Sequence, residues 1–142
     1  MIWPKTFEQR LLAWTQLRES CAQLPVDQAL FAINDWWQSS PWCAYHLHWD
    51  DLQDWPNPWQ LLNDNIYCDI ARGLGIMYTI VMLDRDDVQD AQLVETQTHN
   101  LVLVQGEKYI LNWDSSSILN TNFKSVAIRK SITQQSVRQK LQ

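Results

Sequence analysis

Hydrophobic residues recur at helical spacing over the first part of the chain. Thr6 and Gln9 form a capping-box pattern, which marks the start of a helix. The apolar positions that follow are three or four residues apart, namely Phe7, Leu11, Trp14, Leu17 and Cys21. A second helix is expected from Asp27, with Leu30, Ile33 and Trp37 on one face, and Pro41 ends it. Both stretches predict amphipathic helices.

A third helical region is predicted from about residue 58 to residue 74. Three residues of the capping type, Asn63, Asp64 and Asn65, stand together in it and indicate an interruption. Cys68 comes just after this break, so we expect it to open a new helix that runs to Leu74.

The pattern changes after Gly75. Ile76–Leu83 is short and rich in β-branched residues, which favours a buried strand. Residues 93–105 and 108–114 predict a hairpin around Gly106-Glu107, and residues 123–128 predict an edge strand. Helices followed by antiparallel strands are typical of an α+β fold, with N-terminal helices packed on a small antiparallel sheet. We expect a single domain over residues 1–128 and a basic tail over residues 129–142.

The composition fits one globular domain and has one unusual feature. The chain has 142 residues, of which 46% are hydrophobic and nine are tryptophans. Trp14 and Trp37 fall on predicted helix faces and are expected in the core. A small domain buries only some side chains of this size, so others are candidates for a partner surface, namely Trp3, Trp36, Trp42 and Trp49.

Charge and targeting signals narrow the class of partner. Residues 1–114 hold all 16 acidic residues and six of the 11 basic ones, whereas residues 115–142 hold five basic residues and no acid. The acidic body argues against nucleic-acid binding, and the basic tail is expected to fold back on it. We expect no signal peptide and no membrane-spanning run, and three cysteines without a framework spacing favour a reduced compartment. We expect a cytoplasmic or virion location.

The predicted hairpin brings two polar residues together. If Gln105 faces Lys108, Leu103 faces Ile110 and His99 faces Asp114. A carboxylate in that position can orient an imidazole, and Cys68 at a helix start would supply a thiol, since a helix N-terminus favours the thiolate. The alternative interpretations are an ordinary cross-strand ion pair and a cysteine buried in the core.

The stretch from Asp54 to Asp114 resembles the transglutaminase-like cysteine peptidase superfamily, within the papain-like cysteine peptidases, and in particular its small bacterial branch. The resemblance lies in the Trp/Pro segment DWPNPWQLL, the YCDIA segment around Cys68, and the strands HNLVLV and YILNWD. It implies Cys68 as the nucleophile, His99 as the general base and acid, and Asp114 as the residue that orients the imidazole. Asn112 is an alternative match for the acid, and bulky Ile66-Tyr67 replaces the small turn that usually precedes the cysteine.

Two functions follow from these observations. One is a thiol-dependent hydrolase or acyltransferase acting on a peptide or protein, with Trp55, Trp59 and Trp113 lining the cleft. The other is a non-catalytic structural or interaction protein on the same scaffold, whose compact, Trp-rich style resembles tail or baseplate proteins of tailed-phage virions.

No cofactor or metal is expected. Cys43, His46 and His48 match no zinc spacing, and the loop from Asp84 to Asp90 lacks the glycine and glutamate of a calcium loop.

Overall fold

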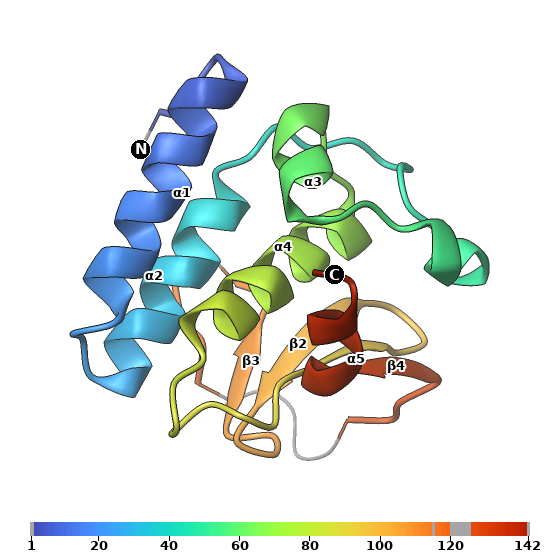
Figure 1. Ribbon diagram of the computed structural model, residues 1–142. Coiled ribbons are helices and arrows are strands. Elements are labelled where there is room, and N and C mark those ends of the chain that lie inside the picture. The colour runs from blue at the N-terminus through green and yellow to red at the C-terminus, as the bar shows by residue number, and fades with distance from the viewer. Residues whose placement is uncertain (1, 115, 120–125, 142) are drawn as a thin grey trace.

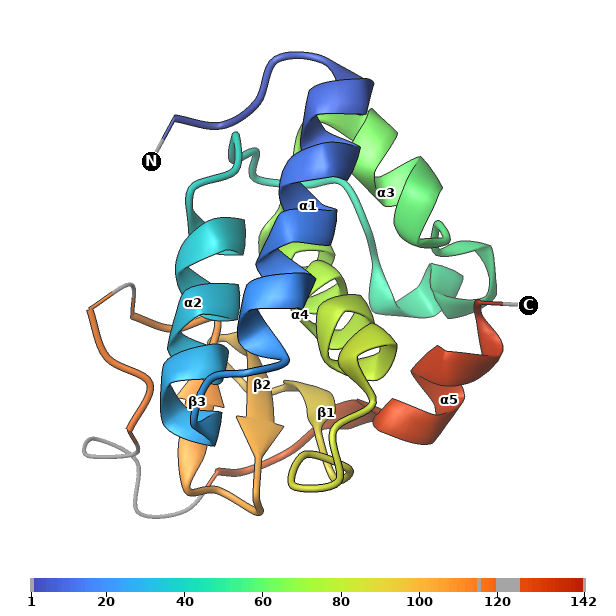
Figure 2. The same cartoon turned by 60° about the vertical axis from the view of Figure 1, so that its left-hand side comes forward.

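The computed structural model describes residues 2–114, 116–119 and 126–141 and shows an α+β fold, as predicted (Figure 1). In chain order, the described elements are α1 (Phe7–Cys21), α2 (Val26–Gln38), the 3-10 helix η1 (Trp49–Asp54), α3 (Pro58–Asp64), α4 (Asp69–Leu83), β1 (Gln92–Glu95), β2 (Asn100–Val104), β3 (Tyr109–Leu111), β4 (Lys130–Thr133) and α5 (Gln134–Gln139). The four strands form one antiparallel sheet in the order β3-β2-β1-β4. Helices α1, α2 and α4 lie together on one side of this sheet (Figure 2).

Local capping signals mark the starts of α1 and α3. The Thr6 side chain accepts the N–H of Gln9, and the Gln9 side chain accepts the N–H of Thr6, which completes the capping box of α1. Helix α3 begins with a second capping box between Asn57 and Gln60 and ends at Asn65, which adopts a left-handed conformation with a φ of 57°.

The prediction of a strand at Ile76–Leu83 is wrong, because this segment is the second half of α4. The helix packs against α1, α2, α3 and α5 as well as against β1 and β2, so 11 of its 15 residues are buried. A helix enclosed on all sides has no polar face, and its sequence then reads like a buried strand. A Cβ atom at Gly75 would lie 2.6 Å from the Trp37 ring, so glycine is what allows α2 to approach this closely.

The predicted strand over residues 93–105 is divided in two. Strand β1 ends at Glu95, and a tight turn follows in which the Thr96 N–H donates to the His99 carbonyl at 2.8 Å. Strand β2 then runs back antiparallel to β1, with Leu93 opposite Val102.

The hairpin of β2 and β3 has the predicted pairing, with Leu103 opposite Ile110. Gly106 has a φ of 71°, a conformation that favours glycine, and the Asp90 carboxylate accepts the N–H groups of Gln105 and Gly106 at 2.8 and 2.7 Å. Asp90, from the acidic loop before β1, therefore caps the turn.

The described part of the basic segment, residues 129–141, is built into the fold. Strand β4 pairs with β1, and α5 packs against α4 through buried Val137. Lys130 and Arg138 form ion pairs with Asp50 and Asp84 at 3.2 Å each, which carries the segment back onto the acidic body. The predicted edge strand at 123–128 begins outside the described residues, and 126–128 belong to no strand.

The helices meet around a single buried hydroxyl group. The indole N–H groups of Trp14 and Trp37 donate to Thr79 Oγ1 at 2.8 and 3.0 Å, and this hydroxyl donates to the Gly75 carbonyl at 2.7 Å. Thr79 is fully buried and both tryptophans are 1% exposed, so the prediction that they lie in the core is confirmed. Each polar atom of this group has a partner away from water.

We predict that Thr79→Val lowers the free energy of unfolding by about 2–4 kcal/mol, because valine leaves two buried indole donors without an acceptor. Thr79→Ser keeps the hydroxyl and loses one methyl group, which costs about 1 kcal/mol. Urea unfolding followed by circular dichroism measures both values. Equal losses for the two variants would contradict a role for the hydroxyl.

Candidate functional site

The candidate site lies at the N-terminus of α4. Tyr67 pairs with Trp42 in a short parallel bridge, in which the Tyr67 N–H donates to the Pro41 carbonyl at 2.9 Å and the Cys43 N–H donates to the Tyr67 carbonyl at 3.0 Å. Burial raises the pKa of Tyr67 to about 12, and its hydroxyl donates to the Leu61 carbonyl at 2.7 Å. This anchor holds the segment after Trp42 beside the start of the helix.

Cys68 is the N-cap residue of α4, as expected for a cysteine that opens a helix. Its side chain is 3% exposed, and the Leu47 N–H donates to its Sγ at 3.3 Å. The sulfur borders a cleft of about 160 Å³, whose lining residues are Ala44, Tyr45, Leu47, His48, Cys68, Asp69, Ile70 and Asn100. The thiol is therefore almost enclosed and lies at the wall of this cleft.

His99 lies away from the cleft. Val102 and Val104 pack with the helices, whereas Leu101 and Leu103 belong to a separate cluster on the other face of the sheet. His99 precedes Leu101 by two positions, which places it toward that other face. Its Nδ1 lies 2.7 Å from Thr98 Oγ1. The centroid of its ring lies 4.2 Å from that of the Trp113 ring, and the two rings meet edge-on.

Asp114 does not continue the ladder opposite His99. Strand β3 ends at Leu111, and Asn112 adopts a left-handed conformation with a φ of 67°, which turns the chain. The Asp114 carboxylate accepts the N–H and hydroxyl of Ser116 at 2.8 Å each, and these hydrogen bonds lower its pKa. Within the described part of the chain, no hydrogen bond or ion pair joins Cys68, His99 and Asp114.

A network of carboxamides occupies the place where these three residues were expected to meet. Asn112 Nδ2 donates to the carbonyls of Asp69 and Asn100 at 2.8 Å each, and its Oδ1 accepts from Gln38 at 2.8 Å. It thereby joins α2, the first residue of α4 and the start of β2.

Two further amides complete the network. Buried Asn34 accepts the Asn112 N–H at 2.8 Å and donates to the Asp114 carbonyl at 2.9 Å, which fixes the chain after β3 against α2. Asn100 Oδ1 accepts the Trp49 indole N–H at 2.8 Å at the edge of the cleft. Sequence reasoning missed Asn34, Gln38 and Asn100, since isolated amides on predicted helices and strands carry no motif.

One positive charge lies near the thiols. The Arg72 guanidinium donates to the hydroxyl of Ser40 at 3.0 Å and also to its carbonyl. Burial lowers the pKa of Arg72, while the nearby Asp69 carboxylate and the sulfurs of Cys43 and Cys68 oppose that shift.

No protein-family model, curated protein or solved structure matches this chain. The site is therefore interpreted from its own geometry and chemistry.

The tryptophans predicted to line the cleft do not border the cavity at Cys68. Trp55 is buried, and its indole N–H donates to the His48 carbonyl at 2.8 Å, on the side of an adjacent hollow. Trp59 is exposed on α3, and Trp113 is exposed beside His99. Of the four candidates for a partner surface, Trp36 and Trp49 are buried, Trp3 is partly buried and only Trp42 is largely exposed.

The histidine-rich segment has a simple structural role. His46 Nε2 lies 3.1 Å from Asp64, which links the segment to the end of α3. Within the described ranges, no group of three or more His, Cys, Asp or Glu side chains is arranged to hold a metal ion. No helix in these ranges combines the length and apolar character needed to span a membrane.

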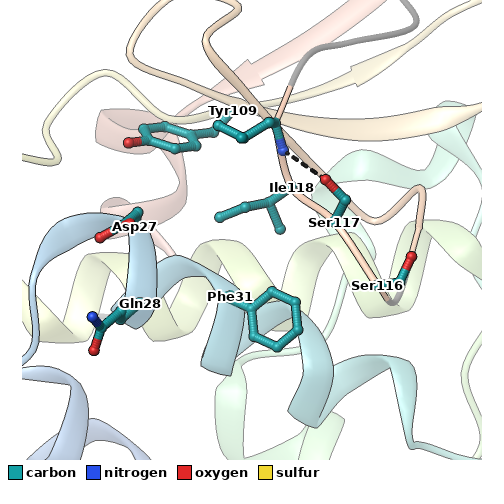
Figure 3. A pocket seen from close by; sticks show the side chains of 8 residues that line it. Asp27, Gln28, Phe31, Tyr109, Ser116, Ser117 and Ile118 are labelled. Atoms are coloured by element: carbon teal, nitrogen blue, oxygen red, sulfur yellow. Dashed lines mark hydrogen bonds between the residues drawn. The ribbon is translucent and has the colours of Figure 1, made fainter.

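A second cleft, of about 350 Å³, lies between α2 and β3 (Figure 3). Phe31, Tyr109 and Ile118 supply its apolar walls, and Asp27 and Gln28 lie at its edge. Its lining contains none of the site residues predicted from the sequence. Of these two clefts, the one beside Cys68 therefore contains a residue of the predicted Cys-His-Asp triad.

We predict that Asn112→Ala lowers the free energy of unfolding by about 2–4 kcal/mol, since it removes three hydrogen bonds and forces alanine into a left-handed conformation. Asn112→Gly loses the same hydrogen bonds but tolerates the positive φ, so it should recover about 1 kcal/mol of that loss. Chemical denaturation measures both. If both variants have the free energy of unfolding of the parent chain, the Asn112 side chain does not hold α2, α4 and β2 together.

Proposed function

We propose that this protein is a non-catalytic binding module on a transglutaminase-like scaffold, and that the cleft beside Cys68 receives a segment of a partner protein. The observation that carries the proposal is the identity of the side chains from the sheet beside α4. They are Asn100 at the cleft and Asn112 at the first turn of the helix. Carboxamides neither give nor take a proton near neutral pH, so they cannot serve as the base of a catalytic triad.

The position of the imidazole supports the same proposal. The resemblance to cysteine peptidases implies that His99 accepts the proton of Cys68, which requires a distance of about 2.6–3.2 Å or one bridging water. The ring of His99 instead bonds Thr98 and packs against Trp113. A chain with this arrangement retains the scaffold and lacks the proton transfer.

Exposed aromatic side chains around the start of α4 suit protein binding. Tyr45 lines the cleft and is 82% exposed, and Trp42, which is 56% exposed, donates its indole N–H to the Asp69 carboxylate at 3.2 Å. Trp113 is 40% exposed and follows Asn112 directly. Tryptophan and tyrosine are the residues that most often anchor protein interfaces. A larger assembly, such as a phage tail or baseplate, is a setting in which such a module would act.

A thiol-dependent acyl transfer is the second candidate. It is favoured by the position of Cys68, whose sulfur is at a helix N-terminus, borders an open cleft and accepts the Leu47 N–H. His48 lines the same cleft and provides an imidazole from the loop rather than from the strand.

The binding function predicts that a displayed library of random peptides yields ligands for this cleft. Such peptides should bind the intact chain and lose most of their affinity for the Trp42→Ala and Tyr45→Ala variants, because interface aromatics contribute about 2 kcal/mol or more each. Leu12→Ala is the matched control, since Leu12 is 59% exposed on α1. Ligands that bind all variants equally would place the binding surface elsewhere.

Among the described residues, no imidazole is hydrogen-bonded to the Cys68 sulfur, and this predicts the rate at which iodoacetamide alkylates it at pH 7. Cys68 should react no faster in the folded chain than in urea, and His99→Ala should not change the rate. Asn100→His places an imidazole at the cleft and should accelerate the reaction by about tenfold or more, because a neighbouring base can take the thiol proton and the thiolate is the nucleophile. Thr98→His, outside the cleft, is the control.

These rates also decide between the two functions. Selective labelling of Cys68 in the native chain, faster than in urea and lost in His99→Ala or His48→Ala, would overturn the non-catalytic proposal in favour of acyl transfer.

A further inference from the structure

We propose that Cys43 and Cys68 form a reversible disulfide when a hydroperoxide reaches the cleft, which makes this pair a redox site of the protein. The inference concerns the two thiols alone, and it stands whether or not the cleft binds a partner or transfers an acyl group.

Backbone pairing brings the two cysteines side by side. Trp42 and Tyr67 are partners in a parallel bridge, and Cys43 and Cys68 each follow by one residue. Adjacent strands lie about 4.8 Å apart, and side chains at matched positions point to the same side. A disulfide requires Cα atoms about 4.4–6.8 Å apart, and the spacing expected of this pairing falls within that range.

Both sulfurs face the same short loop. Cys43 Sγ donates to the Tyr45 carbonyl at 3.6 Å, and Cys68 Sγ accepts the Leu47 N–H at 3.3 Å. Tyr45 and Leu47 are only two residues apart, so the loop contacts both thiols. Burial raises the pKa of Cys43, and the neighbouring sulfur of Cys68 raises it further, as expected when two groups that ionise to anions lie close together.

The surroundings of Cys68 suit it for the first step. Its sulfur borders the open cleft, where a small peroxide can enter, and the Arg72 guanidinium lies within electrostatic range of both thiols. The thiolate is the form that peroxides oxidise, and the cleft gives a peroxide access to this sulfur. Cys43, which is partly buried, is then the resolving thiol.

The reaction balances in two steps. The Cys68 thiolate attacks the terminal oxygen of the hydroperoxide, so an S–O bond forms, the O–O bond breaks, and the alkoxide leaves as an alcohol after it takes a proton. The Cys43 thiolate then attacks the Cys68 sulfur, so an S–S bond forms, the S–O bond breaks, and hydroxide leaves as water. The two thiols lose two electrons in total, and the peroxide gains them.

The third cysteine provides an internal control. Cys21 is fully buried, and its Sγ donates to the Ala29 carbonyl at 3.6 Å between α1 and α2. Burial raises the pKa of Cys21, which opposes formation of the thiolate. It therefore should react with neither peroxide nor the other two cysteines in the folded chain.

The test treats the reduced full chain with hydrogen peroxide, blocks free thiols with N-ethylmaleimide, and maps peptides by mass spectrometry without reduction. We expect the chain to lose the mass of two hydrogens, one linked peptide pair containing Cys43 and Cys68, and alkylated Cys21. Dithiothreitol should restore both thiols. The same treatment in urea should give a mixture of the three possible pairs at a lower rate.

Variants identify the order of the steps. Cys43→Ser should leave Cys68 as a sulfenic acid that dimedone traps, whereas Cys21→Ser should form the Cys43–Cys68 disulfide as the parent chain does. The proposal is overturned if Cys43 and Cys68 stay alkylatable after peroxide treatment, if linkage occurs only between chains, or if the folded chain links them no faster than in urea. The readout is a covalent bond, so failure of peptide binding or of acyl transfer leaves it unaffected.

Discussion

The hydroxyl group of Thr79 fixes the arrangement on which the rest of the molecule depends. It accepts the indole N–H groups of Trp14 and Trp37 and donates to a carbonyl of its own helix, so α1, α2 and α4 meet at one point with every polar atom paired. The close approach also requires Gly75, since any side chain there would enter the space of the Trp37 ring. Loss of the hydroxyl would leave two buried indole donors without an acceptor, at a cost of about 1–3 kcal/mol for each unsatisfied group.

This packing determines what stands at the N-terminus of α4. With the helix held between α1, α2 and the sheet, its first residues reach the start of β2, and Asn112 bridges the gap to the carbonyls of Asp69 and Asn100. The same amide is tied to α2 through Gln38. The cleft beside Cys68 is thus bordered by a rigid joint of carboxamides and backbone carbonyls, with a loop anchored by the pairing of Trp42 and Tyr67 on its other side.

Local rules predicted much of the fold, and the failures have physical causes. The capping box at Thr6, the break at Asn65 and the hairpin around Gly106 depend on neighbouring residues, and all three are present. The second half of α4 lacks a polar face because it is enclosed on every side, so its periodicity was lost. The turn between β1 and β2 contains neither glycine nor proline and gave no signal.

The candidate site was predictable only as far as the pairing continued. The hairpin register holds to Leu111, and the left-handed conformation of Asn112 then turns the chain, so His99 and Asp114 separate. A single residue in that conformation changes which side chains reach α4, and asparagine is one of the few residues that adopt it readily. No spacing rule shows this in advance.

The carboxamides and the thiols near the cleft respond differently to pH and to oxidants. Carboxamides keep their hydrogen bonds over the whole range of pH in which the fold is stable, so the joint around Asn112 provides shape and polarity that do not vary. Thiols change with the oxidant that reaches them, and two of them lie beside this joint. Among the described residues, no imidazole is hydrogen-bonded to the Cys68 sulfur. Oxidation by a peroxide does not require such a base, and Cys43 is the thiol that the fold places next to Cys68.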